Sequence, residues 1–148
     1  MMKCNVKTPC FIVDKELLIK NLNILHQVEQ NTGCKILLAQ KCFSMFHVYP
    51  LIGEYISGTT ASGLFEAKLG REHMNLENHV YAAAYRDDEI DEILEVSDHV
   101  VFNSFSQWNR YKDKVVESGN SCGLRINPEC STQEGHAIYD PCSPFSRM

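Results

Sequence analysis

The sequence predicts an α/β fold in which the strands of a parallel sheet are joined by helices. Short apolar runs alternate with longer amphipathic segments along residues 35–127, and glycines or capping residues separate them. Strand–helix alternation of this kind is typical of a parallel sheet with helical crossovers. The first apolar run of this region also ends in a lysine, Lys41. Ligands collect beyond the carboxyl ends of strands in such sheets.

A strand–helix unit is predicted to precede the sheet. Residues 9–13 form a short apolar run that predicts a strand, and Asp14 is placed to cap the helix that follows. Apolar residues recur at helical spacing from residue 15 to about residue 30, at Leu18, Leu22 and Leu25. Gly33 is expected to end this helix.

Five strands are predicted from Lys35 onward. Their apolar runs cover residues 35–40, 59–61, 79–83, 99–102 and 122–126. A run this short, bounded by glycine, is typical of a buried parallel strand. The helices between them are predicted at residues 46–56, 64–69, 87–96 and 105–118, with Gly58, Gly70 and Gly119 as end signals.

The last of these helices has the clearest local signals. Ser104 and Gln107 have the spacing of a capping box. An apolar stripe follows, which we expect to pack on the sheet rather than to bind a cofactor; it consists of Phe105, Trp108, Tyr111 and Val115.

Composition argues against several classes of function. The net charge is −5 and no basic stripe is present, so we expect no nucleic-acid partner. No apolar stretch could span a membrane and no signal peptide is recognisable, so we expect a cytoplasmic protein without a membrane partner. The seven cysteines have no CxxC spacing and are expected to be reduced. The six histidines form no metal-binding motif, so we expect no metal site.

Lys41 is the first candidate for chemistry. It stands at the carboxyl end of the strand predicted at residues 35–40, among apolar residues. An amine whose ammonium form loses hydration becomes nucleophilic, which is what a Schiff-base lysine needs. A strand-end lysine can also lay its stem on apolar side chains and keep its charge in solvent. Position alone leaves both interpretations open and favours the second.

The length of the chain limits the architecture. A (β/α)8 barrel has eight strands and typically about 250 residues, whereas this chain has 148 residues. We therefore expect either a compact open sheet or part of something larger. The predicted segments are an N-terminal strand and helix (1–34), a partial (β/α) barrel (35–127) and a truncated loop tail (128–148). The tail has no periodicity, which favours the second possibility.

Six segments follow one another in a specific order along the chain. They are residues 8–14 (TPCFIVD), 34–44 (CKILLAQKCFS), 58–62 (GTTAS), 98–104 (DHVVFNS), 122–128 (CGLRINP) and 139–144 (YDPCSP). Together they resemble the carboxynorspermidine decarboxylases. These are pyridoxal-phosphate (PLP) enzymes of polyamine synthesis, in the fold group of alanine racemase and ornithine decarboxylase. Each segment is short, but the ordered series is specific.

The resemblance implies an α/β fold that is an incomplete PLP-binding (β/α)8 TIM-type barrel, with about five of eight strands, the family's C-terminal β domain being absent. It implies pyridoxal 5'-phosphate as cofactor. It also implies decarboxylation of a small polyamine carboxylate, carboxynorspermidine or carboxyspermidine, in norspermidine or spermidine biosynthesis. The full-length parent is expected to be a homodimer. Family members are more than twice as long, so we expect an N-terminal fragment that is inactive alone.

The resemblance also suggests roles for individual residues. Lys41 corresponds to the family's catalytic lysine, which holds the cofactor covalently. Arg125 corresponds to a residue beside that lysine and is expected to bind the cofactor; the residues alone fit equally well an arginine paired with a carboxylate at the barrel rim. Asp140 is a candidate for substrate binding, but Asp-Pro is also an ordinary turn signal, and the turn is favoured. Thr59 stands where ornithine decarboxylase relatives have an aspartate, so no acidic role is transferred.

Two alternatives remain. An incomplete barrel leaves an open sheet edge and apolar helix faces. The chain could therefore be a non-catalytic PLP-binding protein, or an inactive truncated product that needs a partner to complete the barrel. A class I aldolase also uses a strand-end lysine, but the ordered segments do not resemble one.

Overall fold

The structure is a computed structural model that describes residues 6–132 and 140–143. Its five strands form one parallel sheet in the order β1-β2-β3-β4-β5. The strands are β1 (Leu37–Ala39), β2 (Gly58–Ala61), β3 (Glu77–Tyr81), β4 (His99–Phe102) and β5 (Ser121–Leu124). The sequence prediction of five parallel strands is confirmed.

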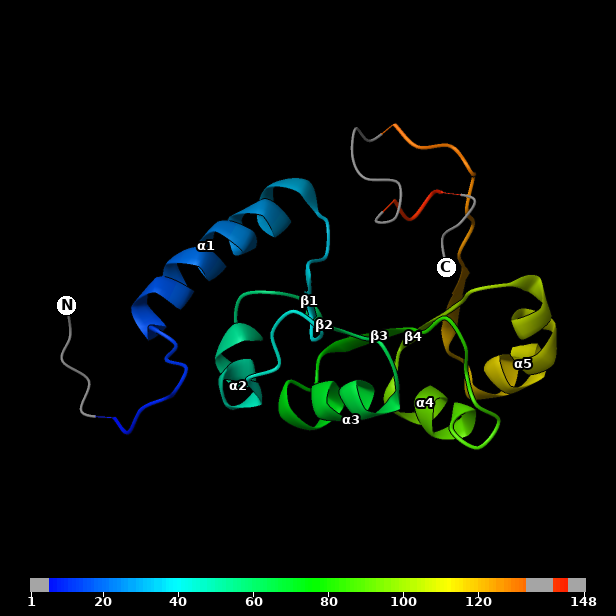
Figure 1. The fold of residues 1–148 in the computed structure, drawn as a ribbon, viewed down its shortest axis with the longest axis horizontal. Coiled ribbons are helices and arrows are strands. Elements are labelled where there is room, and N and C mark those ends of the chain that lie inside the picture. The colour runs from blue at the N-terminus through cyan, green and yellow to red at the C-terminus, as the bar shows by residue number, and fades with distance from the viewer. Residues whose placement is uncertain (1–5, 133–139, 144–148) are drawn as a thin grey trace.

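The connecting helices decide which kind of α/β fold this is. They are α2 (Tyr49–Ile52, after the 3₁₀ turn η1, Phe46–Val48), α3 (Leu64–His73), α4 (Ile90–Val96) and α5 (Phe105–Ser118). Helices α2, α3 and α4 follow one another along the same side of the sheet, and α1 (Lys15–Thr32) lies at the β1 end (Figure 1). A doubly wound fold carries helices on both faces and reverses its strand order. Sequential strand order with helices on one face is the arrangement of a (β/α) barrel.

The predicted capping residues begin and end the two long helices. Oδ1 of Asp14 accepts hydrogen bonds from the backbone N–H groups of Glu16 and Leu17, at 3.0 and 3.1 Å. Gly33 ends α1 with a φ of +70°, a conformation that glycine adopts without strain. Ser104 caps α5 by accepting from the N–H of Gln107 at 3.2 Å. These local signals fix where the chain turns back toward the sheet.

Two apolar clusters hold the helices on the sheet. The larger lies under α3, α4 and α5 and includes Val80, Val100, Phe102, Ile90, Ile93, Tyr111 and Val115. The smaller joins α1 to the β1 end and consists of Leu22, Tyr49, Ile52, Ile56 and Met74. Since successive strand residues face opposite sides, the same strands leave their other residues on the face turned away from these helices.

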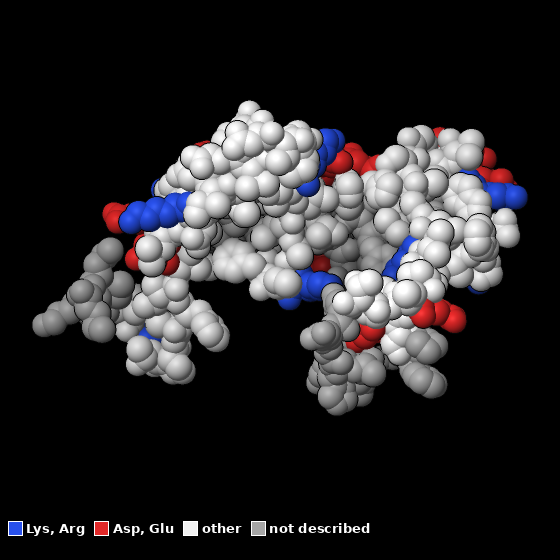
Figure 2. Space-filling model, turned by 90° about the horizontal axis from the view of Figure 1, so that it is seen from above, with Lys and Arg blue, Asp and Glu red and all other residues white. Residues whose placement is uncertain are grey.

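That second face of the sheet, called the polar face below, carries a row of polar residues across four strands. The register aligns Thr60 with His79, His79 with His99, and His99 with Ser121. In a closed barrel this face is the interior, and its carboxyl end carries the functional site. Charged side chains of both signs occur in small groups on the face shown in Figure 2. No helix among the described residues is long and apolar enough to cross a membrane.

The first predicted strand is wrong. Residues 9–13 have no regular secondary structure, and Phe11 is fully exposed. No described strand lies beside them to take up their backbone hydrogen bonds, and an isolated extended segment has no stability of its own.

Two predicted helices have wrong ends. The helix predicted at 46–56 ends at Ile52, and Gly58 belongs to β2, where a Cβ would lie 1.9 Å from the carbonyl oxygen of Glu77. Helix α3 continues through Gly70 to His73. A Cβ at Gly70 would lie 2.4 Å from Oγ1 of Thr59, so close packing accounts for this glycine, which does not end the helix. Strand β3 begins two residues earlier than predicted, and β5 begins one residue earlier. The prediction that Phe105 packs on the sheet is also wrong, because its side chain is 69% exposed.

Candidate active site at the carboxyl edge of the sheet

Lys41 lies immediately beyond β1. The N–H of Gln40 donates to the carbonyl of Thr60 at 3.2 Å, so β1 stays beside β2 for one residue past Ala39. The chain then turns, with the N–H of Cys42 donating to the carbonyl of Ala39 at 2.9 Å. Lys41 is exposed within this turn, and its ammonium group forms no ion pair with a described residue. Its amine is thus accessible at the carboxyl edge of the sheet.

The residue before Lys41 is anchored on the helix side of the sheet. Gln40 is 1% exposed, and its Oε1 accepts from the Tyr49 hydroxyl at 3.4 Å. Its Nε2 has no hydrogen-bond partner among the described residues. Lys41 follows Gln40 in the turn that closes on Ala39, so Lys41 is placed at the carboxyl edge of the sheet, next to the end of β1.

Arg125 lies at the same edge, beyond β5. Its N–H donates to the carbonyl of Phe102 at 2.9 Å, which continues the pairing with β4. Nη1 donates to the Tyr81 hydroxyl at 3.3 Å and to Oδ1 of Asn103 at 3.5 Å. The Tyr81 hydroxyl in turn donates to Oδ1 of Asn103 at 2.7 Å. The ends of three neighbouring strands therefore converge on one guanidinium group.

The surroundings of Arg125 are polar but uncharged. Nη2 donates to the carbonyl of Pro141 at 3.1 Å, and the guanidinium carbon lies 5.9 Å from the centre of the Tyr81 ring. No carboxylate among the described residues forms an ion pair with it. The described residues therefore do not support the alternative in which Arg125 pairs with a carboxylate at the barrel rim. No described residue compensates its positive charge, at the edge that also carries Lys41.

Asp140 forms a turn. Its Oδ1 accepts from the N–H of Cys142 at 2.8 Å, and its carbonyl accepts from the N–H of Ser143 at 3.1 Å. The turn interpretation is confirmed. The turn also lies beside the site, because its Pro141 carbonyl binds Arg125. Substrate binding by Asp140 stays a prediction.

Sequence reasoning missed Tyr81 and Asn103. The strand prediction of 79–83 placed Tyr81 in the middle of a strand, whereas it is the last residue of β3. Asn103 follows β4 directly, at the boundary that the sequence did predict. Polar residues at the ends of neighbouring parallel strands are the signal that would have found both.

A second group of polar side chains lies on the polar face of the sheet, nearer the amino ends of its strands. Glu77 forms an ion pair with Lys35 and accepts from Nε2 of His79 at 2.7 Å, and both contacts hold the pKa of Glu77 below its ordinary range. The His79 and His99 rings lie 4.8 Å apart between centres, and Nδ1 of His99 is 2.5 Å from the Ser121 hydroxyl. Burial, and then the neighbouring His79, lower the pKa of His99.

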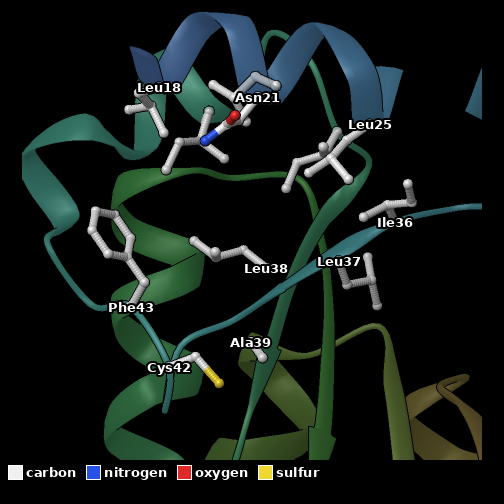
Figure 3. Close-up of a pocket in the computed structure, with 12 residues that line it drawn as sticks. Leu18, Asn21, Leu25, Ile36, Leu37, Leu38, Ala39, Cys42 and Phe43 are labelled. Atoms are coloured by element: carbon white, nitrogen blue, oxygen red, sulfur yellow. The ribbon is translucent and has the colours of Figure 1, made fainter. Parts of the chain in front are cut away.

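An apolar hollow lies apart from both polar groups. It is a cavity of about 250 Å³ between α1 and β1. Figure 3 shows Leu18 and Leu25 of α1 facing Leu38 of β1 across it. Cys42 also lines this cavity. Asn21 is its single lining residue with a polar side-chain nitrogen or oxygen, so the cavity offers no acid, base or charged group for chemistry.

The fold and the strand-end lysine together define a class of protein. A parallel sheet in sequential order, with helices along one face and Lys41 beyond the carboxyl end of its first strand, is part of a barrel of the decarboxylase and aldolase type. No family model matches the chain. Comparison with known protein sequences specifies this class further.

The chain is homologous to part of the carboxynorspermidine decarboxylases. It is 41% identical over 97% of its length to the carboxynorspermidine/carboxyspermidine decarboxylase of Herminiimonas arsenicoxydans, and equally to that of Campylobacter jejuni. It is 38% identical to the carboxyaminopropylagmatine decarboxylase of Synechocystis sp.. The chain spans 37–38% of the length of these relatives.

The solved structures agree with this assignment. The crystal structure of carboxynorspermidine decarboxylase from Campylobacter jejuni, complexed with norspermidine, matches 88% of this chain and 35% of its own, with a TM-score of 0.81 and 41% identity. A D-threonine aldolase from Filomicrobium marinum matches with a TM-score of 0.71 at 12% identity, which shows a shared fold alone. The resemblance found in the sequence is confirmed, for a part of the relatives' length.

Proposed function

We propose that this chain supplies the lysine-bearing part of a PLP-dependent carboxy-lyase. In that role Lys41 would hold the cofactor covalently through Nζ and be displaced by the amine of the substrate. When bound, the cofactor supplies an electron sink for the bond that releases carbon dioxide. The exposed amine of Lys41 and the guanidinium of Arg125, neither of which forms an ion pair with a described residue, fit such a group, since PLP carries an aldehyde and a phosphate.

The substrate we propose is a carboxylated polyamine, carboxynorspermidine or carboxyspermidine. The names of three relatives support this proposal, because each describes the decarboxylation of a carboxylated amine. Arg125 would contribute a fixed positive charge to the binding of an oxyanion, and the apolar cavity beside Cys42 would not take part. We also propose that the chain divides into the segments 1–34, 35–127 and 128–148. For the full-length parent we propose a homodimer.

One observation carries the proposal: Lys41 stands beyond the end of β1, at the edge of the sheet where Tyr81, Asn103 and Arg125 converge. Titration of the chain with PLP tests it. We expect a visible absorbance band of the protein-bound cofactor that Lys41→Ala abolishes. Lys112→Ala, which removes an exposed lysine of α5, should leave the band unchanged. A band that survives in Lys41→Ala would remove Lys41 from the site.

Turnover is a separate question from binding. The described residues place Lys41 and Arg125 at the strand ends, and we propose that this chain alone does not decarboxylate its substrate at the rate of a complete enzyme. Release of carbon dioxide from carboxynorspermidine, measured with the chain and added PLP, checks this. A rate equal to that of a full-length relative would refute it.

A further inference from the structure

Arg125 is held in place by neutral groups. Its Nη1 meets the Tyr81 hydroxyl and Oδ1 of Asn103, and its Nη2 meets the carbonyl of Pro141. Neutral acceptors orient a guanidinium group without cancelling its charge, whereas a carboxylate would do both. The group is therefore oriented but still available to a ligand of opposite charge.

Tyr81 and Asn103 are themselves fixed. The Tyr81 hydroxyl donates to Oδ1 of Asn103 at 2.7 Å, and the Tyr81 ring lies beneath the guanidinium carbon. The N–H of Asn103 donates to Oε1 of Gln107 at 2.9 Å, and Nε2 of Gln107 donates to the carbonyl of Ala83 at 2.8 Å. The network thus runs from the start of α5 to the ends of β3 and β4.

We propose that Tyr81 and Asn103 are positioning residues that hold the guanidinium of Arg125 toward an oxyanion ligand at the carboxyl edge of the sheet. A guanidinium group binds a carboxylate or a phosphate through paired N–H donors, and the pairing is effective only when the plane of the group is fixed. This inference rests on the proposed function for the location of the ligand. The immobilisation of Arg125 does not depend on the cofactor.

The order of the Arg125 side chain is the first test. The chain contains five arginines, so ¹⁵N-labelled arginine gives few Nε–H signals, and the signal missing in Arg125→Lys identifies Arg125. We expect its Nε–H to be ordered on the nanosecond timescale in the unaltered chain and clearly more mobile in Tyr81→Phe and in Asn103→Ala. Tyr55→Phe, which changes a tyrosine packed against the smaller apolar cluster, should leave the Arg125 signal unchanged.

The second test uses inorganic phosphate and acetate as probes. We expect the Arg125 signal to shift on titration with one of them, and the affinity to fall several-fold in Tyr81→Phe while circular dichroism shows the same fold. A stronger response to phosphate indicates a phosphate ligand, and a stronger response to acetate indicates a carboxylate.

Two results would overturn the inference. One is equal order of Arg125 in the unaltered chain and in both variants. The other is the absence of a response of Arg125 to either probe. Failure of PLP to bind Lys41, with Arg125 ordered and responsive, would count against the proposed function alone.

Discussion

The Thr59 hydroxyl donates a hydrogen bond of 2.9 Å to Oδ1 of Asn78, in a buried pair that lies directly against Gly70 of α3. Nδ2 of Asn78 donates to the carbonyls of Ala67 and Val96, both at 2.8 Å. The pair therefore ties β2 and β3 to α3 and the end of α4. Gln40, the residue before Lys41, also lies against Gly70, so the same packing supports the end of β1.

Replacement of Gly70 by alanine should destabilise the chain. A Cβ there would lie 2.4 Å from Oγ1 of Thr59 and 3.0 Å from Nε2 of Gln40. Overpacking of this kind costs about 1–3 kcal/mol, which exceeds the gain of roughly 0.5–1 kcal/mol for alanine over glycine in a helix. Urea unfolding of Gly70→Ala measures the difference.

The control for this prediction is a double variant. Thr59→Ala removes the atom that the new Cβ would meet, so Gly70→Ala in that background should cost less than it does alone. Strictly additive losses in the double-mutant cycle would show that Gly70 is not required by the contact with Thr59.

Loss of the Tyr85 hydroxyl should also destabilise the fold. This buried hydroxyl lies 2.8 Å from the carbonyl of Val101 and 3.2 Å from the carbonyl of Val80, and it accepts from the N–H of Ala82. Tyr85→Phe leaves these buried groups without a partner, at a cost of about 1–3 kcal/mol. Thermal or urea unfolding measures this cost. Tyr55→Phe is the matched control, and an equal loss in both variants would contradict the role of the hydroxyl.

Tyr85 also predicts instability in alkali. Burial raises its pKa from 10.0 to about 12 in the folded chain. The folded state therefore keeps a proton that the unfolded state loses. The contribution of the protonated Tyr85 hydroxyl to the free energy of unfolding is fully present below pH 10 and is lost as the pH rises from 10 to about 12. Unfolding free energy measured across this range should fall less steeply in Tyr85→Phe; an unchanged pH dependence in that variant would assign the loss to other groups.

His99, on the polar face, predicts a loss of stability in acid. Burial and the neighbouring His79 lower the pKa of His99 below its ordinary 6.5, so the unfolded state binds a proton that the folded state resists. The stability that depends on a neutral His99 is present above pH 6.5 and is lost as pH falls through its folded pKa. Glu77, whose pKa is also lowered, adds a further loss below about pH 4.5.

His99→Gln separates these two contributions. We expect the variant to lose the pH dependence of unfolding that begins near pH 6.5 and to keep the one that begins near pH 4.5. A variant with the same dependence near pH 6.5 as the unaltered chain would show that His99 does not cause it.

The sequence predicted well those features that local chemistry determines. Asp14, Gly33, Ser104 and Gly119 cap their helices as expected, because a cap needs only its own backbone neighbours. The five strands and their parallel direction followed from the alternation of apolar runs. Gly70 was misassigned because its packing against Thr59 is a contact between separate elements, which a glycine in a sequence does not reveal.

The site was predicted less completely than the fold. Lys41 was a candidate from its position at a strand end, the resemblance gave roles to Lys41 and Arg125, and the structure places both at the carboxyl edge of the sheet. Tyr81 was missed because a two-residue shift in β3 changes which residue ends the strand. Residues 9–13 were predicted as a strand from their β-forming composition, but a strand also requires a neighbour, and the described residues provide none.

Reductive trapping tests the assignment of Lys41 most directly. The chain is incubated with PLP, reduced with sodium borohydride and mapped by mass spectrometry of its peptides. Our account predicts one dominant adduct, on Lys41, that is absent in Lys41→Ala and retained in Lys112→Ala. Labelling spread over the exposed lysines in proportion to their accessibility, with no preference for Lys41, would contradict it.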